Sequence, residues 1–360
     1  MIIGLDGKRA FFNHSGLGNY SRLVIQALLD SNPEVQIICY LPKTPKLAPA
    51  FLDHPRFHVV FLKGGNLKRT IGFADEIATN GCDVYWGLSN ELPLGHKPKG
   101  IPYWVTIHDV IWYRYPHLFS WIDRTIYKFK TLRTLKRADR IIAVSTQTKN
   151  DLIEIFGADP KKIEVIGQNC ESMFYQTVEQ ELKTKICEKY GLIPNQFLVQ
   201  VGTVEERKNG ELSIRALKES GSKKTLAFFG RKTKYQEILS FLAQELGIPE
   251  QVKFYNQAVF SDLPAIYQSA IGSVYPSHFE GFGIPVLESI ASGTPLLVAT
   301  GSCLEETAGP CATVVSPTDV QGAALWIKSL QEIKKPHPDR EMWLENFNTA
   351  KLAKRWLQSD

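Results

Sequence analysis

The stretch GSVYPSHFEGFGIPVLESIASGTPLLV, residues 272–298, contains two apolar runs separated by a helix-like segment. The runs at Gly272–Tyr275 and Pro295–Val298 are typical of buried strands. Between them, Pro285 suits the first position of a helix, and Gly293 suits the residue that follows its last turn. This order of strand, helix and strand predicts one βαβ unit of a parallel sheet.

The same alternation extends from this unit towards both ends of the chain and predicts an α/β protein. Further strands are predicted at Ile2–Leu5, Val35–Leu41, Phe57–Leu62, Val84–Trp86, Tyr103–Ile107, Arg140–Val144, Phe197–Val201, Thr225–Phe229, Val252–Tyr255 and Ala312–Val315. Helices are predicted at Leu17–Asp30, Trp121–Ala138, Thr146–Phe156, Val178–Tyr190 and Ile284–Ser292. Ser145 is expected to cap the third of these helices.

Length and the restart of the pattern divide the chain in two. A chain of 360 residues is long for one simple core, since domains usually hold about 100 to 200 residues. We place the boundary within Val165–Thr177, with an N-terminal domain over residues 1–170 and a C-terminal domain over residues 171–345. Because open parallel sheets bind ligands beyond the carboxyl ends of their strands, we expect a cleft between the domains to hold the site.

Composition and charge exclude several classes of protein. The chain has 42 Lys and Arg against 37 Asp and Glu, and a net charge of +5 is too small for wholesale binding of nucleic acid. Its six cysteines stand singly, so we expect no zinc cage or disulfide framework and a reducing cytosol. The sequence opens without a leader, and its apolar runs fall short of the ~18 residues of a membrane span. We therefore expect a cytoplasmic protein that does not span a membrane.

The segment EGFGIPVLE, residues 280–288, combines a glycine loop with the start of a helix. The first amides of a helix and its positive dipole end suit a phosphate group. Glu288 lies about one turn inside this helix and can accept hydrogen bonds from a diol such as a ribose. Glu280 in the loop can reach polar groups on the other side of the phosphate. The alternative is a capped helix with one solvated glutamate.

A second segment, VGTVEERKNG at residues 201–210, follows a predicted strand. The strand breaks at Gly202, and Asn209 can cap the next helix. Arg207 and Lys208 stand directly before that cap. The planar guanidinium of an arginine and the mobile ammonium of a lysine together suit a diphosphate leaving group, whose negative charge grows as its bond to the sugar breaks. The alternative is a solvated charged loop, which is what charged runs such as E-E-R-K usually form.

Two features of the first half also draw attention. Gly16 and Gly18 precede an amphipathic helix in a near match to G-x-G-x-x-G, but they stand too far beyond Leu5 for a dinucleotide fingerprint. We interpret them as allowing a ligand to approach the backbone closely, with a plain loop as the alternative. His108-Asp109 ends an apolar strand. A lone histidine is more often a packed or surface residue than a catalytic one, but a position at the carboxyl end of a strand improves the case for a functional role.

Several catalytic motifs are absent from the sequence. It contains no D-x-D pair, no H-E-x-x-H, no G-x-x-x-x-G-K-[ST] and no G-x-S-x-G. These absences argue against an enzyme that binds its nucleotide through a metal ion, a zinc protease, a P-loop hydrolase and a serine hydrolase. We expect neither a metal site nor a cofactor.

Taken together, the glycine loop Gly16–Gly18, His108-Asp109, the VGTVEERKN segment and the EGFGIPVLE segment resemble the retaining GT-B glycosyltransferases of family 4, the group 1 glycosyltransferases. The resemblance runs in order from about residue 2 to about residue 300. It implies a GT-B fold, in which two Rossmann-like domains face each other across a cleft. The second domain would hold a nucleotide-diphosphate sugar and the first a glycan acceptor. A final helix at residues 346–357 would pack back on the first domain.

The resemblance also implies roles for single residues. Those matching Arg207 and Lys208 neutralise the donor diphosphate, and the one matching Glu288 holds the ribose. The histidine matching His108 lies beside the transferred sugar. Contacts to the sugar and phosphates come from the residues matching Glu280, Phe282, Gly283 and Ile284. We accordingly assign catalysis to His108, Arg207, Lys208 and Glu280. Donor binding is assigned to Gly16, Gly18, Gly202, Arg207, Lys208, Phe282, Gly283, Ile284 and Glu288.

The implied reaction is transfer of a hexose with retention of the anomeric configuration, driven by stabilising the departing diphosphate. The segments TIHDVIWYRYP, residues 106–116, and VGTVEERKN resemble a subgroup that includes mannosyltransferases of bacterial surface polysaccharides. GDP-mannose is therefore the expected donor and a growing glycan the expected acceptor. UDP- and dTDP-hexoses are alternatives. A sugar-nucleotide epimerase or hydrolase and a non-enzymatic sugar-nucleotide binder on the same scaffold are others.

A strongly basic stretch, WIDRTIYKFKTLRTLKRADR at residues 121–140, interrupts the otherwise mixed charge. Its acids are Asp123 and Asp139, and its cations are Arg124, Lys128, Lys130, Arg133, Lys136, Arg137 and Arg140. Its apolar members include Trp121, Ile122, Tyr127, Phe129 and Leu132. Such a helix can lie on the anionic inner face of a membrane, which favours an acceptor on a lipid carrier. The alternative is a solvated helix whose apolar stripe packs on the first sheet.

Overall fold

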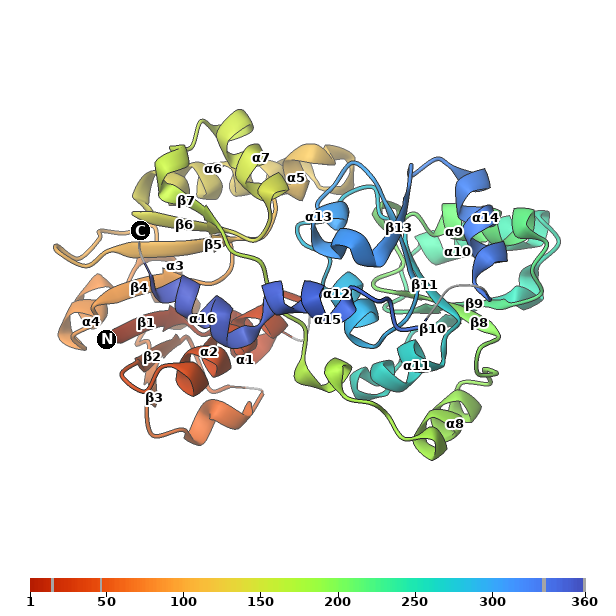
Figure 1. Cartoon of the computed structure of the whole chain (residues 1–360). Helices are drawn as coiled ribbons and strands as arrows, with labels where there is room; N and C mark the ends of the chain where they lie inside the picture. Colours follow the sequence, from red (N-terminus) through yellow and green to blue (C-terminus); the bar gives the residue numbers. More distant parts are fainter. Residues whose placement is uncertain (14–15, 46, 332–334, 359–360) are drawn as a thin grey trace. The chain divides into compact units, whose positions relative to one another are not determined.

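The computed structural model describes residues 1–13, 16–45, 47–331 and 335–358. The chain forms two compact units, one from residues 1–168 with 347–360 and the other from residues 169–346 (Figure 1). Each unit is built on a parallel sheet covered by helices, which confirms the predicted α/β class with two Rossmann-like domains. Within the described ranges, no helix has the length and apolar character that crossing a bilayer requires.

The first unit contains a seven-stranded sheet in the order β3-β2-β1-β4-β5-β6-β7, in which all neighbours are parallel. Its strands are β1 (Ile2–Asp6), β2 (Gln36–Leu41), β3 (Phe57–Phe61), β4 (Val84–Gly87), β5 (Tyr103–Ile107), β6 (Arg140–Ala143) and β7 (Ile163–Val165). Parallel strands end at the same edge of a sheet, so the segments that follow β1, β4 and β5 lie together there.

Helices cover both faces of this sheet. They are α1 (Lys8–Phe12), α2 (Gly16–Ser31), α3 (Gly65–Ile71), α4 (Ala74–Thr79), α5 (Ile111–Arg114), α6 (Trp121–Arg137), α7 (Thr146–Phe156) and α16 (Thr349–Leu357). Helices α2 and α16 pack on one face, where Val24, Leu28 and Trp356 share a core. Phe73, Ile77 of α4 and Leu152 of α7 are buried against the other face.

The last helix, α16, belongs to the first unit although it follows the whole second unit in sequence (Figure 1). It packs along α2, and Leu352, Ala353 and Trp356 are buried in the core on that face. Arg140, at the start of β6, donates hydrogen bonds to the carbonyls of Arg355 and Trp356. Aliphatic burial and these charge-assisted bonds together hold the end of the chain on the first sheet.

The second unit contains a six-stranded parallel sheet in the order β10-β9-β8-β11-β12-β13. Its strands are β8 (Phe197–Val201), β9 (Thr225–Phe229), β10 (Val252–Tyr255), β11 (Gly272–Tyr275), β12 (Leu296–Ala299) and β13 (Ala312–Val315). Its helices are α8 (Gln180–Lys189), α9 (Gly210–Ser220), α10 (Tyr235–Glu245), α11 (Leu263–Ser269), α12 (Ile284–Ala291), α13 (Leu304–Ala308), α14 (Val320–Ser329) and α15 (Arg340–Leu344). Helices α9, α10 and α14 share the core on one face.

The predicted helix ends are confirmed where the sequence carries a specific signal. The hydroxyl of Ser145 accepts a hydrogen bond from the amide of Thr148 at 3.1 Å and so caps α7. Pro285 lies in the first turn of α12, and Gly293 beyond its end has a φ of +72°. That backbone conformation is easy for glycine and strained for other residues, which explains why the helix ends there.

Candidate active site

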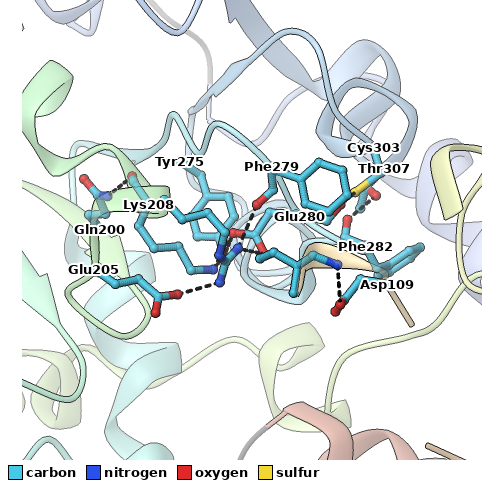
Figure 2. A network of polar contacts seen from close by, with 12 residues as sticks. Asp109, Gln200, Glu205, Lys208, Tyr275, Phe279, Glu280, Phe282, Cys303 and Thr307 are labelled. Carbon is cyan, nitrogen blue, oxygen red and sulfur yellow. Dashed lines mark hydrogen bonds and ion pairs between the residues drawn. The ribbon is translucent and has the colours of Figure 1, made fainter. Parts of the chain in front are cut away.

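Two cations and one carboxylate form a largely buried network at the carboxyl edge of the second sheet. Arg207 and Lys208 end a short 3-10 turn that follows β8, and Glu280 follows β11. A terminal nitrogen of Arg207 lies 2.7 Å from one oxygen of Glu280, while the Lys208 ammonium pairs with the other oxygen. Figure 2 shows Lys208 and Glu280 pointing toward each other. The structure thus brings three of the predicted catalytic residues into direct contact.

Two side chains that the sequence did not single out complete this network. The hydroxyl of Tyr275, the last residue of β11, donates to Glu280 at 3.2 Å and accepts a hydrogen bond from Lys208 (Figure 2). Glu205 accepts from Arg207 at 2.6 Å. Tyr275 could have been found from its place at the carboxyl end of a strand, directly before the glycine loop.

The carboxyl group of Glu280 keeps its charge at neutral pH. Burial alone would raise the pKa of Glu280, but Lys208 and Arg207 outweigh it and lower this pKa to about 2. Burial lowers the pKa of Lys208 against the opposing effect of Glu280. Burial also disfavours charge on Arg207, yet Glu280 and Glu205 raise its pKa. An ionised carboxylate therefore orients two cations that an incoming anion can share.

A hollow of about 230 Å³, which includes its open mouth, lies beside Lys208. Gly202 lines it with a φ of +135°, and a Cβ at this residue would lie 3.4 Å from the Lys208 side chain. Phe228 and Leu239 form an apolar part of the lining. Gly230 approaches so closely that its Cβ would lie 1.8 Å from the Gly202 carbonyl oxygen. The positive φ therefore favours glycine at residue 202, and the close contact leaves no room for a side chain at residue 230.

The start of helix α12 lies beyond the glycine loop. Gly283 precedes it with a φ of +93°, and a Cβ there would come within 2.7 Å of the Leu304 side chain. Ile284 and the following first-turn residues present the positive end of the helix dipole. The carbonyl of Phe282 accepts a hydrogen bond from Thr307, which fixes the loop from behind (Figure 2). This arrangement suits an anion at the helix end.

Glu288 lies one turn inside α12, and 5% of it is exposed. The hydroxyl of Tyr267 donates to its carboxyl group at 3.2 Å. Burial raises the pKa of Glu288 to about 7, although the bond from Tyr267 lowers it and the charge of Glu171 adds to the rise. A buried carboxyl with one weak partner is available to accept further hydrogen bonds.

His108 follows β5 at the carboxyl edge of the first sheet, as predicted. Its Nε2 lies 2.9 Å from the carbonyl oxygen of Leu88, and its ring packs edge-on against Tyr20 at 4.6 Å. Burial lowers the pKa of His108 to about 4, although the contact with Leu88 raises it. The imidazole is therefore neutral at pH 7, and the Leu88 carbonyl selects the tautomer that carries the proton on Nε2.

Gly16 and Gly18 lie in the first turn of α2 and not in a loop before it. A Cβ on Gly18 would lie 2.0 Å from the backbone oxygen of Asn13, so this glycine is needed for the packing of the chain on itself. A Cβ on Gly16 would meet no atom within 4 Å. At Gly18, the group that approaches the backbone closely is therefore the chain's own Asn13. The role of both glycines in donor binding stays a prediction. His14 and Ser15 lie outside the described residues.

In the described ranges, no group of three or more His, Cys, Asp or Glu side chains is arranged to hold a metal ion. The described cysteines, all six of them, are buried and unbridged. The second unit brings together Arg207, Lys208 and Glu280 near the start of α12.

Two sequence families match the chain. The family described as "Glycosyl transferases group 1" matches residues 183–347, and the one described as "Glycosyltransferase Family 4" matches residues 14–168. The O-antigen chain mannosyltransferase RfbU of Salmonella typhimurium is 28% identical over 261 residues, which are 70% of this chain and 68% of that protein. The O-antigen chain mannosyltransferase B of Escherichia coli is 28% identical over 233 residues, 63% of this chain and 61% of that protein.

Solved structures share the fold over the whole chain. WaaG, a glycosyltransferase involved in lipopolysaccharide biosynthesis, has a TM-score of 0.69 at 17% identity, covering 99% of this chain and 98% of that one. The Anabaena protein HepE in complex with UDP and glucose has a TM-score of 0.72 at 16% identity, covering 99% and 97%. The fold and site therefore define a glycosyltransferase of the GT-B class. Within that class, the chain belongs to the group 1 glycosyltransferases and resembles polysaccharide mannosyltransferases, which confirms the predicted family.

Proposed function

We propose that the protein transfers a hexose from a nucleotide-diphosphate sugar to a growing glycan of a surface polysaccharide, with retention of configuration and without a metal ion. The observation that carries this proposal is the pair Arg207 and Lys208, held by Glu280 beside the start of α12. Fixed positive groups that face a leaving diphosphate stabilise the charge that develops as the glycosidic bond breaks.

In the proposed reaction, the bond between the anomeric carbon and the diphosphate oxygen breaks. The acceptor oxygen bonds to the same face of that carbon, and the acceptor proton passes to the departing diphosphate. Both oxygens of Glu280 are engaged, by Arg207 on one side and by Lys208 and Tyr275 on the other. This engagement argues against Glu280 as a covalent nucleophile and favours a role in orienting the cations.

GDP-mannose is the proposed donor, because the relatives RfbU and mannosyltransferase B are named O-antigen chain mannosyltransferases. A UDP- or dTDP-hexose is the alternative, and HepE was solved with UDP. Incubation with a panel of nucleotide sugars, with and without mannose-terminated glycans, tests the proposal. A transferase consumes donor and acceptor together, an epimerase or hydrolase alters the donor alone, and a non-enzymatic binder changes neither.

Activity is expected to survive treatment with EDTA. The diphosphate would be neutralised by Arg207, Lys208 and the start of α12, so no ion has to be supplied. The measurement is the transfer rate before and after chelation, with a metal-dependent glycosyltransferase in the same buffer as the positive control. Loss of transfer on chelation, with recovery on adding Mn²⁺ or Mg²⁺, would contradict metal independence.

We also propose that helix α6 lies on an anionic membrane surface. Most of its apolar side chains face solvent, with exposed fractions of 69% for Trp121, 53% for Ile122 and 56% for Phe129. The alternative interpretation is a solvated helix whose apolar stripe packs on the first sheet, and Leu135 of this helix is buried there. Exposed aromatic groups among cations are typical of helices that bind anionic lipid headgroups, where each cation contributes about 1 kcal/mol. A lipid-linked glycan would then be the acceptor.

Sedimentation with vesicles tests the membrane proposal. The protein is expected to pellet with phosphatidylglycerol vesicles at low salt, less at high salt, and little with phosphatidylcholine. Replacing Trp121 and Phe129 with serine should release it. The matched control replaces Ile238 and Phe241, which are equally exposed on α10, and should leave binding unchanged. Equal and negligible binding of the wild type to both vesicles would leave α6 as ordinary surface.

A further inference from the structure

One buried asparagine joins several segments at the carboxyl edge of the second sheet. Asn209 follows Lys208 directly, and 6% of it is exposed. Its side-chain NH2 group donates to the carbonyl oxygen of Pro276, after β11, at 3.1 Å and to that of Pro317, after β13, at 2.8 Å. Its side-chain oxygen accepts from the amide of Leu212 in α9 at 3.4 Å. The side chain therefore ties the end of β8 to the ends of β11 and β13.

The backbone of Asn209 is unusual for a residue that caps a helix. Its φ of +52° and ψ of +43° are left-handed, a conformation that asparagine tolerates better than most residues. Capping residues usually have an extended backbone, and one side-chain oxygen is enough for a cap. Strained backbone persists where its surroundings fix it, often at functional sites. The cap of α9 therefore explains neither the left-handed turn nor the two donated hydrogen bonds.

The segment that Asn209 fixes carries the two cations of the active site. The backbone carbonyl of Arg207 accepts from the amide of His278, which follows β11, at 2.9 Å. The backbone carbonyl of Lys208 accepts from the side chain of Gln200 at 2.8 Å (Figure 2). Both carbonyls before Asn209 are thus engaged, and the chain between β8 and α9 is held on the segment that follows β11.

Glu280 belongs to that same segment after β11. Asn209 reaches the segment at Pro276, four residues before Glu280, while Arg207 and Lys208 pair with the Glu280 carboxylate. The two loops are therefore joined at two places, by the amide of Asn209 and by the ion pairs. A displacement of about 1 Å can cost a catalytic group about 10²-fold in rate, so the first junction matters for the second.

We infer that Asn209 is a positioning residue, whose NH2 group holds Arg207 and Lys208 where they stabilise the departing diphosphate. This inference rests on the proposed function, because the diphosphate is part of it. Both N–H groups of the Asn209 amide are used within the protein, so the residue acts through the two cations.

Two substitutions at Asn209 test the inference. Asn209→Asp keeps the oxygen that caps α9 and loses both donors, whereas Asn209→Gly adopts the left-handed backbone without strain and loses the whole side chain. Each should lower kcat about 10- to 100-fold and change KM for the donor less than about threefold, because the cations act mainly as the diphosphate departs. The matched controls, Asn195→Asp and Asn195→Gly, change an exposed asparagine with a φ of +60° before β8 and should keep the wild-type kcat.

A double-mutant cycle tests whether Asn209 acts through Lys208. Asn209→Gly should cost less turnover in the Lys208→Ala protein than in the wild type, because one of the two positioned groups is already gone. Equal costs in both backgrounds would show that Asn209 acts independently of Lys208 and would overturn the inference.

Hydrogen exchange measures the positioning without any transfer reaction. The His278 amide, which donates to Arg207, should exchange faster in both Asn209 variants than in the wild type and the Asn195 controls. Unchanged exchange at His278, a wild-type kcat in either folded Asn209 variant, or a loss confined to KM would overturn the inference. Asn209→Gly keeps the test decisive if Asn209→Asp fails to fold, because it buries no charge. Absence of transfer in the wild type counts against the proposed function alone, and the exchange rates still decide whether Asn209 holds the two loops together.

Discussion

Replacing Arg207 or Lys208 with alanine is expected to lower the turnover number about 10²- to 10³-fold, the usual effect of removing one group that stabilises transition-state charge. Both side chains are 13% exposed and contact Glu280, so water cannot easily replace either of them. Each cation gains interaction energy as the diphosphate departs, and the effect should therefore appear in kcat more than in KM. Steady-state kinetics with the donor that the nucleotide-sugar panel selects measures it.

Two controls accompany this prediction. Arg215→Ala removes an exposed cation paired with Glu211 on α9 and should leave turnover unchanged. The single active-site variants should stay folded, since Glu280 keeps one cation. Removing both cations would leave Glu280 buried and unpaired at a cost of about 3 to 5 kcal/mol, so the double variant also needs Glu280→Gln. Near-normal turnover in that folded triple variant would refute the roles of Arg207 and Lys208.

The parallel sheets could be predicted because their strands are continuous apolar runs bounded by clear breaks. The structure places β8 at Phe197–Val201 and β10 at Val252–Tyr255, the same bounds that the sequence indicates. Strand β7, Ile163–Val165, was missed because three residues carry little periodicity. Helix α3 was missed as well. It is only seven residues long and begins at Gly65, directly after Gly64, and it is held by the ion pairs of Arg69 with Asp6 and Glu91.

The candidate site could be predicted residue by residue but not as a network. The order of the sheet places β8 beside β11, so Lys208 and Glu280 meet although 72 positions separate them. No local sequence pattern predicts that β8 and β11 are neighbours in the sheet. Tyr275 and the ion pairs of Arg69 with Asp6 and Glu91 escaped prediction for the same reason, because they depend on strands that pair at long range. Burial of a side chain also depends on residues far away in the sequence. The shifted pKa values of His108 and Glu288, which burial causes, could therefore not be predicted either.

Glu288→Ala is expected to weaken binding of the nucleoside diphosphate about 10- to 100-fold, because it removes charge-assisted hydrogen bonds to the ribose hydroxyls. Glu280→Ala should chiefly slow transfer, because it disorders Arg207 and Lys208 without touching the proposed ribose site. Calorimetric titration with GDP and UDP separates the two effects. Glu250→Gln, at an exposed position, is the control and should bind as the wild type does. If both alanine variants bind as tightly as the wild type, Glu288 does not hold the ribose.

The raised pKa of Glu288 gives this prediction a second signature. Its carboxyl group must be ionised to accept from both ribose hydroxyls, and with a pKa of about 7 only about a tenth is ionised at pH 6. Nucleotide affinity should therefore rise about tenfold from pH 6 to pH 8 in the wild type and stay flat in Glu288→Gln.

The same carboxyl group affects the stability of the fold. Because the pKa of Glu288 is higher in the folded state than in the unfolded chain, the protein loses stability as pH rises from 4.5 to about 7, by up to about 3 kcal/mol. Glu288→Gln should accordingly melt above the wild type at pH 8 and near it at pH 4, and an identical melting difference at both pH values would show that this carboxyl is not the titrating group.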